Sequence, residues 1–170
     1  PSPLAAALVL SLAAATAGAT GDRPDRLGSG ARPRVLLTPE RIVELRAVRE
    51  TSHREVFSVA KAEADAYLDL PLPADRTRAV NAYRAHGQAL PALALMYRLS
   101  GDPAYLEAAR RWLRCLVGFD SWDGSQNLGR AAFATGVALA YDWLHDALSV
   151  EERALVRARL VREGRILAPV

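Results

Sequence analysis

Apolar residues recur along this chain at the three- and four-residue spacing of one helix face, and no segment alternates as a half-buried strand would. One apolar stripe contains Ile42 and Leu45 and continues to Val48 or Arg49. A second, longer stripe contains Leu106, Ala109, Leu113 and Leu116. The pattern predicts an all-α domain.

Residues typical of helix ends divide this pattern into six helices. Thr38-Pro39-Glu40 and Asp102-Pro103 each place an N-cap residue before a proline at the first helical position. Ser52 with Glu55, and Ser149 with Glu152, have the spacing of capping boxes. We therefore expect helices over 38–49, about 52–70, 75–99, 102–118, 127–147 and 149–164.

Two residues near the middle of the chain affect the third of these helices. Pro91 lies inside it, and because proline lacks a backbone N–H, a kink or a break is expected there. Gly101 follows its last turn, where a left-handed C-cap is expected.

The helix boundaries repeat at a nearly constant interval. Ser52, Ser100 and Ser149 are separated by 48 and then 49 residues, which suggests antiparallel helix pairs stacked side by side. The last unit has no partner before Val170, so we expect the chain to be a fragment of a larger helical array.

The first 34 residues differ in composition from the rest. Residues 1–21 carry no charge, contain an apolar core at 4–12 and end in small residues at 17–19, which predicts a truncated secretory signal. We therefore expect the protein to be exported to a secreted or periplasmic location. A membrane anchor is the alternative, but the core is short for a bilayer, so no stable membrane insertion is expected. Residues 22–34 are expected to be a linker, and 35–170 the helical domain.

Charge and cysteine content narrow the possible functions. The 170 residues include 22 Lys and Arg against 19 Asp and Glu, a net charge of +3, with both signs interspersed. The absence of a basic run argues against nucleic-acid binding.

Cys115 is the single cysteine, which excludes an internal disulfide, and its apolar neighbours suggest a buried inert thiol. Motifs for metals, phosphates or dinucleotides are missing, so no cofactor or metal is expected.

Four blocks of sequence carry a resemblance to a known family. They are RPRVLLTPERIVELR (32–46), ALALMYRLSGDPAYLEAARRWL (92–113), SWD (121–123) and LGRAAFATGVALAYDWLHDALSVEER (128–153). In this order the chain resembles the N-terminal α/α-toroid domain of heparinase II/III-like polysaccharide lyases and their alginate-lyase relatives. The resemblance implies an incomplete α/α toroid, which the remaining toroid helices and a C-terminal β-rich domain would complete in cis.

The same resemblance implies a reaction and a substrate. Enzymes of this family cleave uronic-acid-containing polysaccharide by β-elimination, using Asn, His, Tyr and Arg side chains. Such a catalytic set is expected beyond Val170, so this part of the chain is expected to contain no catalytic residue and to be inactive alone. Two alternatives remain: a non-catalytic helical-repeat module that binds glycan or protein, and a glycoside hydrolase on the same toroid.

Three residues near the SWD block are the predicted substrate-binding residues. Trp122 can stack on a sugar face, Asn127 offers a donor and an acceptor, and Arg130 can pair with a uronate carboxylate. The alternatives are that Trp122 plugs the helix bundle, that Asp123 or Asn127 caps the next helix, and that Arg130 faces solvent.

Histidines provide weaker candidates. Tyr141 and His145 share a helix face, as a proton-transfer pair would, but packing for Tyr141 and a C-terminal cap for His145 are the favoured interpretation. His86 could face a groove, or be a satisfied or exposed helical residue.

Overall fold

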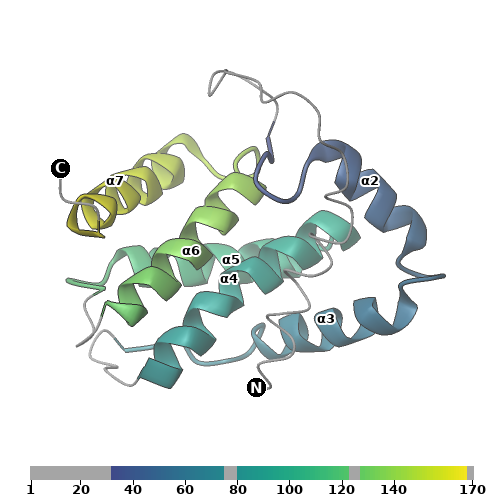
Figure 1. The fold of residues 1–170 in the computed structure, drawn as a ribbon, viewed down its shortest axis with the longest axis horizontal. Coiled ribbons are helices and arrows are strands. Elements are labelled where there is room, and N and C mark those ends of the chain that lie inside the picture. Colours follow the sequence, from purple (N-terminus) through teal and green to yellow (C-terminus); the bar gives the residue numbers. More distant parts are fainter. Residues whose placement is uncertain (1–31, 75–79, 123–126, 168–170) are drawn as a thin grey trace.

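The computed structural model describes residues 32–74, 80–122 and 127–167, and only the backbone of 80–85 among them. Within these ranges it contains six α-helices and no strand (Figure 1). The predicted all-α class is therefore confirmed. The helices are α2 (Pro39–Val48), α3 (Arg54–Ala66), α4 (Val80–Ser100), α5 (Pro103–Val117), α6 (Leu128–Trp143) and α7 (Val150–Leu167).

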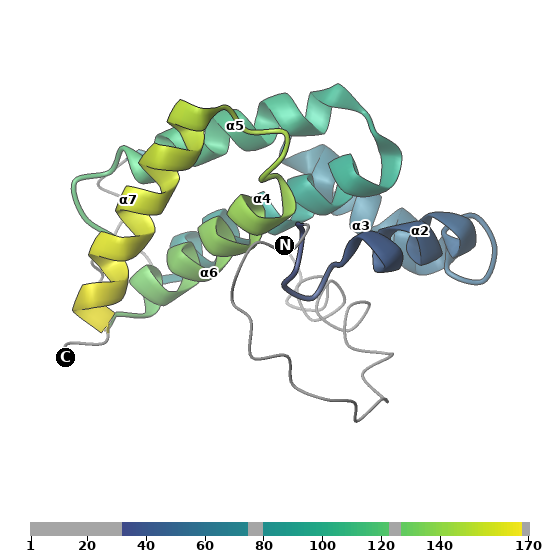
Figure 2. The same cartoon turned by 90° about the horizontal axis from the view of Figure 1, so that it is seen from above.

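The helices form a small bundle in which α4 and α6 lie side by side at the centre. Seen from above, α5 runs along one side of this central pair and α7 crosses the end of the bundle farthest from α2 and α3 (Figure 2). Helix α5 packs on α4, and α7 packs on both α6 and α5. Helices α2 and α3 pack against α4.

Three of the four predicted N-caps are confirmed. Thr38 Oγ1 accepts a hydrogen bond from Arg41 N at 3.2 Å. Asp102 Oδ1 accepts one from Ala104 N at 2.9 Å. The last capping box is reciprocal: the Ser149 hydroxyl accepts from the N3 amide at 3.1 Å, and the Glu152 carboxylate accepts from Ser149 N at 2.9 Å. These caps depend on residues at most three apart.

The capping box predicted at Ser52 is wrong. Helix α3 begins at Arg54, its N-cap is His53, and that residue makes no side-chain cap hydrogen bond. Ser52 Oγ instead contacts His53 Nδ1 at 2.9 Å. The cause is the turn after α2, in which His53 N donates to Val48 O at 3.1 Å and shifts the start of α3 by one residue.

Other helix limits differ from the prediction by a few residues. Helix α4 continues through Pro91 without a break and ends at the left-handed Gly101, whose φ is 77°. Helix α6 ends at Trp143 rather than Ala147, because the next four residues form turns. The expected start of α4 near Asp75 lies outside the described residues.

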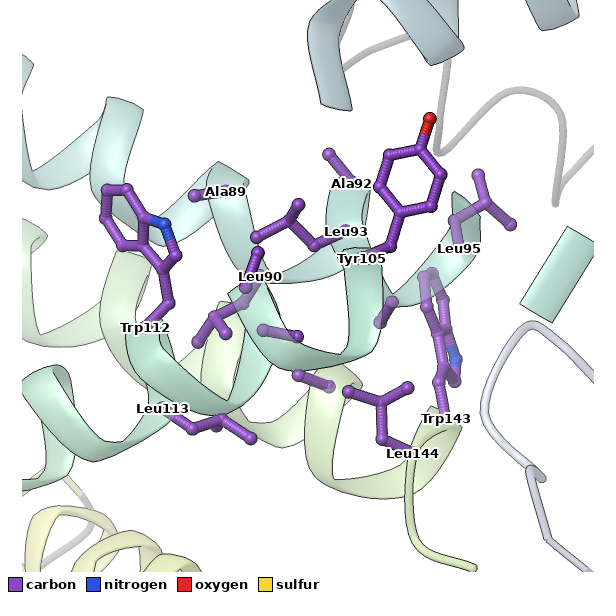
Figure 3. Packing of buried hydrophobic residues seen from close by; sticks show 14 of the residues in the cluster. Ala89, Leu90, Ala92, Leu93, Leu95, Tyr105, Trp112, Leu113, Trp143 and Leu144 are labelled. Atoms are coloured by element: carbon purple, nitrogen blue, oxygen red, sulfur yellow. The ribbon is translucent and has the colours of Figure 1, made fainter. Parts of the chain in front are cut away.

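The core is built from the faces that α4, α5 and α6 turn toward one another. Figure 3 shows Trp112 of α5 and Trp143 of α6 near opposite ends of a cluster of Leu and Ala side chains. Tyr67, just after α3, meets the Trp112 ring edge-to-face at 6.0 Å between centroids. This contact ties α3 to the central helices.

Arginine side chains bind backbone carbonyls at the ends of neighbouring helices. Arg46 of α2 donates two hydrogen bonds to Arg98 O near the end of α4, at 2.9 and 2.6 Å. Arg98 in turn donates to Trp143 O at the end of α6. Arg110 of α5 donates to Ala147 O at 2.5 Å. Since the last carbonyls of a helix lack intrahelical partners, Arg46 and Arg98 satisfy them while linking separate helices, and Arg110 links α5 to the turn after α6.

Two glycines allow the close approach of α4 and α6. A Cβ atom on Gly136 would overlap the carbonyl oxygen of Gly87. A Cβ on Gly87 would lie 2.7 Å from Ala132 O, again a backbone atom that cannot rotate away. Neither position therefore accepts a larger residue without separating the two helices.

We predict that Gly136→Ala lowers the free energy of unfolding by about 2 kcal/mol or more, because α6 must shift away from α4. Gly164→Ala is the matched control, since a Cβ there would meet nothing within 4 Å inside helix α7. The control should gain about 0.5–1 kcal/mol from the better helix propensity of alanine. Urea unfolding of both variants measures the difference. Equal effects would contradict the close packing.

Candidate functional site

The three predicted substrate-binding residues lie in one cluster between α5, α6 and α7. Trp122 follows α5 and is completely buried. Its Nε1 donates to Leu116 O at 2.7 Å, and its ring meets Phe133 of α6 edge-to-face at 6.0 Å. These contacts give Trp122 the plugging position that the sequence offered as the alternative to sugar contact.

Helix α7 brings two charged residues, Arg159 and Glu163, to this cluster. The Arg159 guanidinium lies 4.7 Å from the centre of the Trp122 ring, a cation–π distance. It also donates to Phe119 O, and its Nε lies 3.0 Å from Glu163 Oε1. Glu163 is buried, so this ion pair is shielded from water. Arg159 therefore holds the end of α5 and α7 together.

Arg130 completes the cluster from the first turn of α6. Its Nε donates to Glu163 Oε2 at 2.7 Å, and its NH1 donates to Asn127 Oδ1 at 2.6 Å. The residue is 6% exposed, so the alternative of a solvent-facing arginine is wrong. Arg130 does bind a carboxylate, but that carboxylate belongs to the same chain.

Asn127 is the exposed member of the cluster. Its φ of 56° is left-handed, a conformation that asparagine adopts more readily than most residues. It stands at the N-cap position of α6, as the alternative proposed, and its carbonyl accepts from Ala131 N at 3.0 Å, although its side chain makes no cap hydrogen bond. Asp123, the other residue suggested for that cap, lies outside the described residues.

The structure thus joins Trp122, Asn127 and Arg130 through two residues that sequence analysis missed, Arg159 and Glu163. The available signal was an Arg–Glu pair four residues apart on the buried face of the last helix. Sugar contact by the three predicted residues stays a prediction. Asn127 is the one whose exposure would let a ligand reach it directly.

A second polar cluster binds the segment before α2 to the end of α6. The buried Asp142 carboxylate accepts from Arg34 N at 2.7 Å, Val35 N at 2.8 Å and Arg32 NH1 at 2.6 Å. Trp143 Nε1 donates to Val35 O at 2.7 Å. The last three residues of the predicted linker are therefore held against α6, and the rest of it lies outside the described residues, as does the predicted signal.

The Tyr141–His145 pair lies beside this cluster. The two rings meet edge-to-face at 5.5 Å, but His145 lies in the turn after α6, so the two residues do not share a helix face. The C-cap of α6 is Leu144, so the predicted cap by His145 is wrong. The Arg32 guanidinium lies 5.6 Å from the Tyr141 ring, and His145 Nδ1 lies 3.3 Å from Asp146 Oδ1. These are packing and surface contacts.

Cys115 is half-buried, and its thiol donates to Pro73 O at 3.4 Å.

A groove of about 350 Å³ lies between α4 and α6. Leu36, in the segment held by Asp142, forms part of its wall with a left-handed φ of 63°. Glu63 of α3 and Gln88 of α4 supply polar side chains to a lining that is otherwise mostly apolar. Sequence analysis did not single out Leu36 or Glu63, because neither belongs to a recognisable motif.

Titratable groups gather near one end of this groove. Burial raises the pKa of Glu63, although a hydrogen bond with Tyr67 opposes the shift. Burial and the neighbouring Glu63 raise the pKa of Tyr67 to about 12. Burial lowers the pKa of His86, whose ring lies 5.8 Å from that of Trp112.

Two atoms of this group lack a hydrogen-bond partner. Glu63 Oε2 and His86 Nδ1 are both buried and find no partner in the described part of the chain. His86 is half-buried, so it is not the exposed helical histidine suggested as an alternative, and its Nδ1 is unsatisfied in the described part of the chain. It lies against Trp112, next to the groove residues Gly87 and Gln88.

Other kinds of site are not seen in the described ranges. Residues 32–74, 80–122 and 127–167 contain no group of three His, Cys, Asp or Glu side chains placed to hold a metal ion. Among the helices of those ranges, none combines the length and apolar character needed to cross a membrane.

No protein-family model matches the chain. A search of curated proteins also found no match.

We predict that Glu163→Gln lowers the free energy of unfolding by about 3 kcal/mol, because it leaves two buried guanidinium groups without their carboxylate. Glu107→Gln is the control. It removes an exposed ion pair with Arg110 at 2.6 Å and should change stability by about 0.5 kcal/mol or less. Denaturant unfolding of each variant tests this. A loss from Glu163→Gln no greater than that of the control would refute the importance of the buried pair.

Glu63 should also affect the pH dependence of stability. The pKa of Glu63 is higher in the folded state than the ordinary 4.5. Its contribution to the free energy of unfolding is therefore present below pH 4.5 and is lost as pH rises through the raised pKa. Glu63→Gln should therefore become more stable relative to the unmodified protein as pH rises. Glu40 has a lowered pKa from hydrogen bonds at the start of α2, so Glu40→Gln should show the opposite trend. Unfolding curves of both variants and of the unmodified protein, recorded from acidic to neutral pH, show whether the stability difference rises or falls with pH.

Proposed function

We propose that this chain is the N-terminal part of a secreted or periplasmic polysaccharide lyase that cleaves uronic-acid-containing polysaccharide by β-elimination. The observation that carries the proposal is the packing of α4 along α6, with α5 on α4 and α7 on both α6 and α5. The pairs α4–α5 and α6–α7 are then two neighbouring units of an incomplete α/α toroid, with α4 and α6 as inner helices.

Contacts between the blocks that resemble the lyase family support this proposal. Asp142 and Trp143, in the last block, bind Arg34 and Val35 of the first block. Residues more than a hundred positions apart thus form one structural unit, which gives a physical reason for the two blocks to occur together.

In this proposal the described helices supply scaffold and substrate-binding surface. Elimination needs a base for the proton next to the uronate carboxyl, a group that stabilises charge on that carboxyl, and an acid for the leaving oxygen. We assign these roles to residues beyond Val170, in the rest of the toroid and the β-rich domain. Asn127, exposed at the start of α6, would contact the acidic polysaccharide.

A non-catalytic binding module is the second candidate. The mostly apolar groove between α4 and α6 favours it, because such a lining is typical of sites that bind small ligands or peptides. This candidate requires no residues beyond Val170.

The test is to incubate the product of the gene extended beyond Val170 with polymers of uronic acid. A lyase produces the ultraviolet absorbance of a conjugated unsaturated uronate in step with new reducing ends. Reducing ends without that absorbance would indicate hydrolysis and overturn the proposal, and binding without cleavage would favour the second candidate. The 170-residue chain alone is expected to show no turnover.

A variant tests the predicted contact in the same assay. Asn127→Ala should raise KM about five-fold, as expected for the loss of one hydrogen bond worth about 1 kcal/mol. Ser58→Ala, an exposed change on α3, is the control and should leave KM unchanged. An unchanged KM in Asn127→Ala would remove Asn127 from the substrate-binding surface.

A further inference from the structure

We propose that the groove between α4 and α6 binds a small amphipathic amine, with the apolar body of the ligand in the groove and its ammonium group on Glu63. This site is separate from the predicted polysaccharide contact at Asn127. Two independent features of the structure point to it: the shape and lining of the groove, and a buried carboxylate oxygen without a donor.

The lining suits an apolar ligand body. Side chains with little or no polarity form most of the wall, including those of Leu36, Pro91, Ala92, Leu128, Leu139 and Trp143. The volume of about 350 Å³ falls at the lower end of the range of roughly 300–1,000 Å³ found for small-molecule sites. A ligand with one ring or a short alkyl chain therefore fits better than an extended polymer.

Glu63 determines which polar group the ligand carries. Its carboxylate hydrogen-bonds with Tyr67, while Oε2 is buried and has no partner in the described part of the chain. Among the described residues that line the groove there is no Lys or Arg. Glu63 is half-buried, and a carboxylate oxygen enclosed without a donor is costly, so a ligand ammonium would supply both the missing donor and an opposite charge.

The backbone at Leu36 gives the groove a rigid edge. Leu37 N donates to Val35 O at 2.7 Å, which closes a tight turn around Leu36 with its left-handed φ of 63°. Such a conformation is strained for leucine and persists here because Asp142 and Trp143 hold the flanking residue Val35 from the other side. The Leu36 wall is thus in place before any ligand arrives.

Three probes with the same body and different head groups test the proposal on the 170-residue chain: phenethylamine, phenethyl alcohol and phenylacetate. Calorimetry gives the affinities, and amide shifts of Leu36, Gly87 and Ala131 report where each probe binds. We expect phenethylamine to bind about tenfold more tightly than the alcohol, since a hydrogen bond to a charged group contributes more than a neutral one. Phenylacetate should bind more weakly than the alcohol.

Substitutions distinguish the contribution of the Glu63 charge to probe affinity from the contribution of the groove itself. Glu63→Gln should weaken phenethylamine about tenfold and leave phenethyl alcohol unchanged, while Glu55→Gln, an exposed change on the same helix, should alter neither. Ala131→Leu fills the groove from the exposed side of α6 and should weaken both probes. Circular dichroism of each variant verifies that the fold is retained.

Several outcomes would overturn the proposal. They are no binding of phenethylamine, equal affinities for the three probes, preference for phenylacetate, and unchanged amine affinity in Glu63→Gln. Because the assay uses no uronate polymer and no turnover, its failure would leave the lyase proposal standing, and failure of the lyase proposal would leave this one standing.

Discussion

The close contact between α4 and α6 is the constraint on which the remaining structure depends. Glycine at 87 and 136 lets the two backbones approach to a distance that any side chain would prevent. Helices α5 and α7 then pack on this central pair, and α3 joins it through Tyr67 and Trp112. The groove borders the same contact, because Gly87 and Gly136 both lie in its wall.

Arginine joins the periphery of the bundle to this centre. A guanidinium group is planar, carries several donors and is more weakly hydrated than the ammonium group of lysine. It can therefore reach a carbonyl at the end of another helix or in the turn that follows it, as Arg46, Arg98 and Arg110 do. The sequence has a single lysine, Lys61, and that residue pairs with Asp65 on its own helix at 2.7 Å. The distribution of the two basic residues thus matches a difference in their chemistry.

Two glutamates illustrate how the same side chain acquires different roles. Glu163 is enclosed by Arg130 and Arg159, so its charge is neutralised and it serves to hold α6 and α7 together. Glu63 faces an apolar groove, and burial raises its pKa. A structural carboxylate is one whose partners come from the chain itself, whereas an incompletely partnered one next to a cavity is a candidate for binding. Glu163 has a sequence signal in the arginine four residues before it, whereas the sequence neighbours of Glu63 do not distinguish it from the exposed glutamates.

What the sequence by itself determined is local. The helices, the caps at Thr38, Asp102 and Ser149, and the left-handed Gly101 follow from interactions over at most four residues, which are visible in the order of the chain. The tertiary structure decided the rest. It moved the N-cap of α3 from Ser52 to His53, where the turn after α2 binds His53 N to Val48 O. It also turned Arg130 inward and made Asp142 an anchor for Arg32, since the partners of these residues lie 33 and 110 positions away. Contacts over such separations depend on how whole helices pack, and no local pattern encodes that.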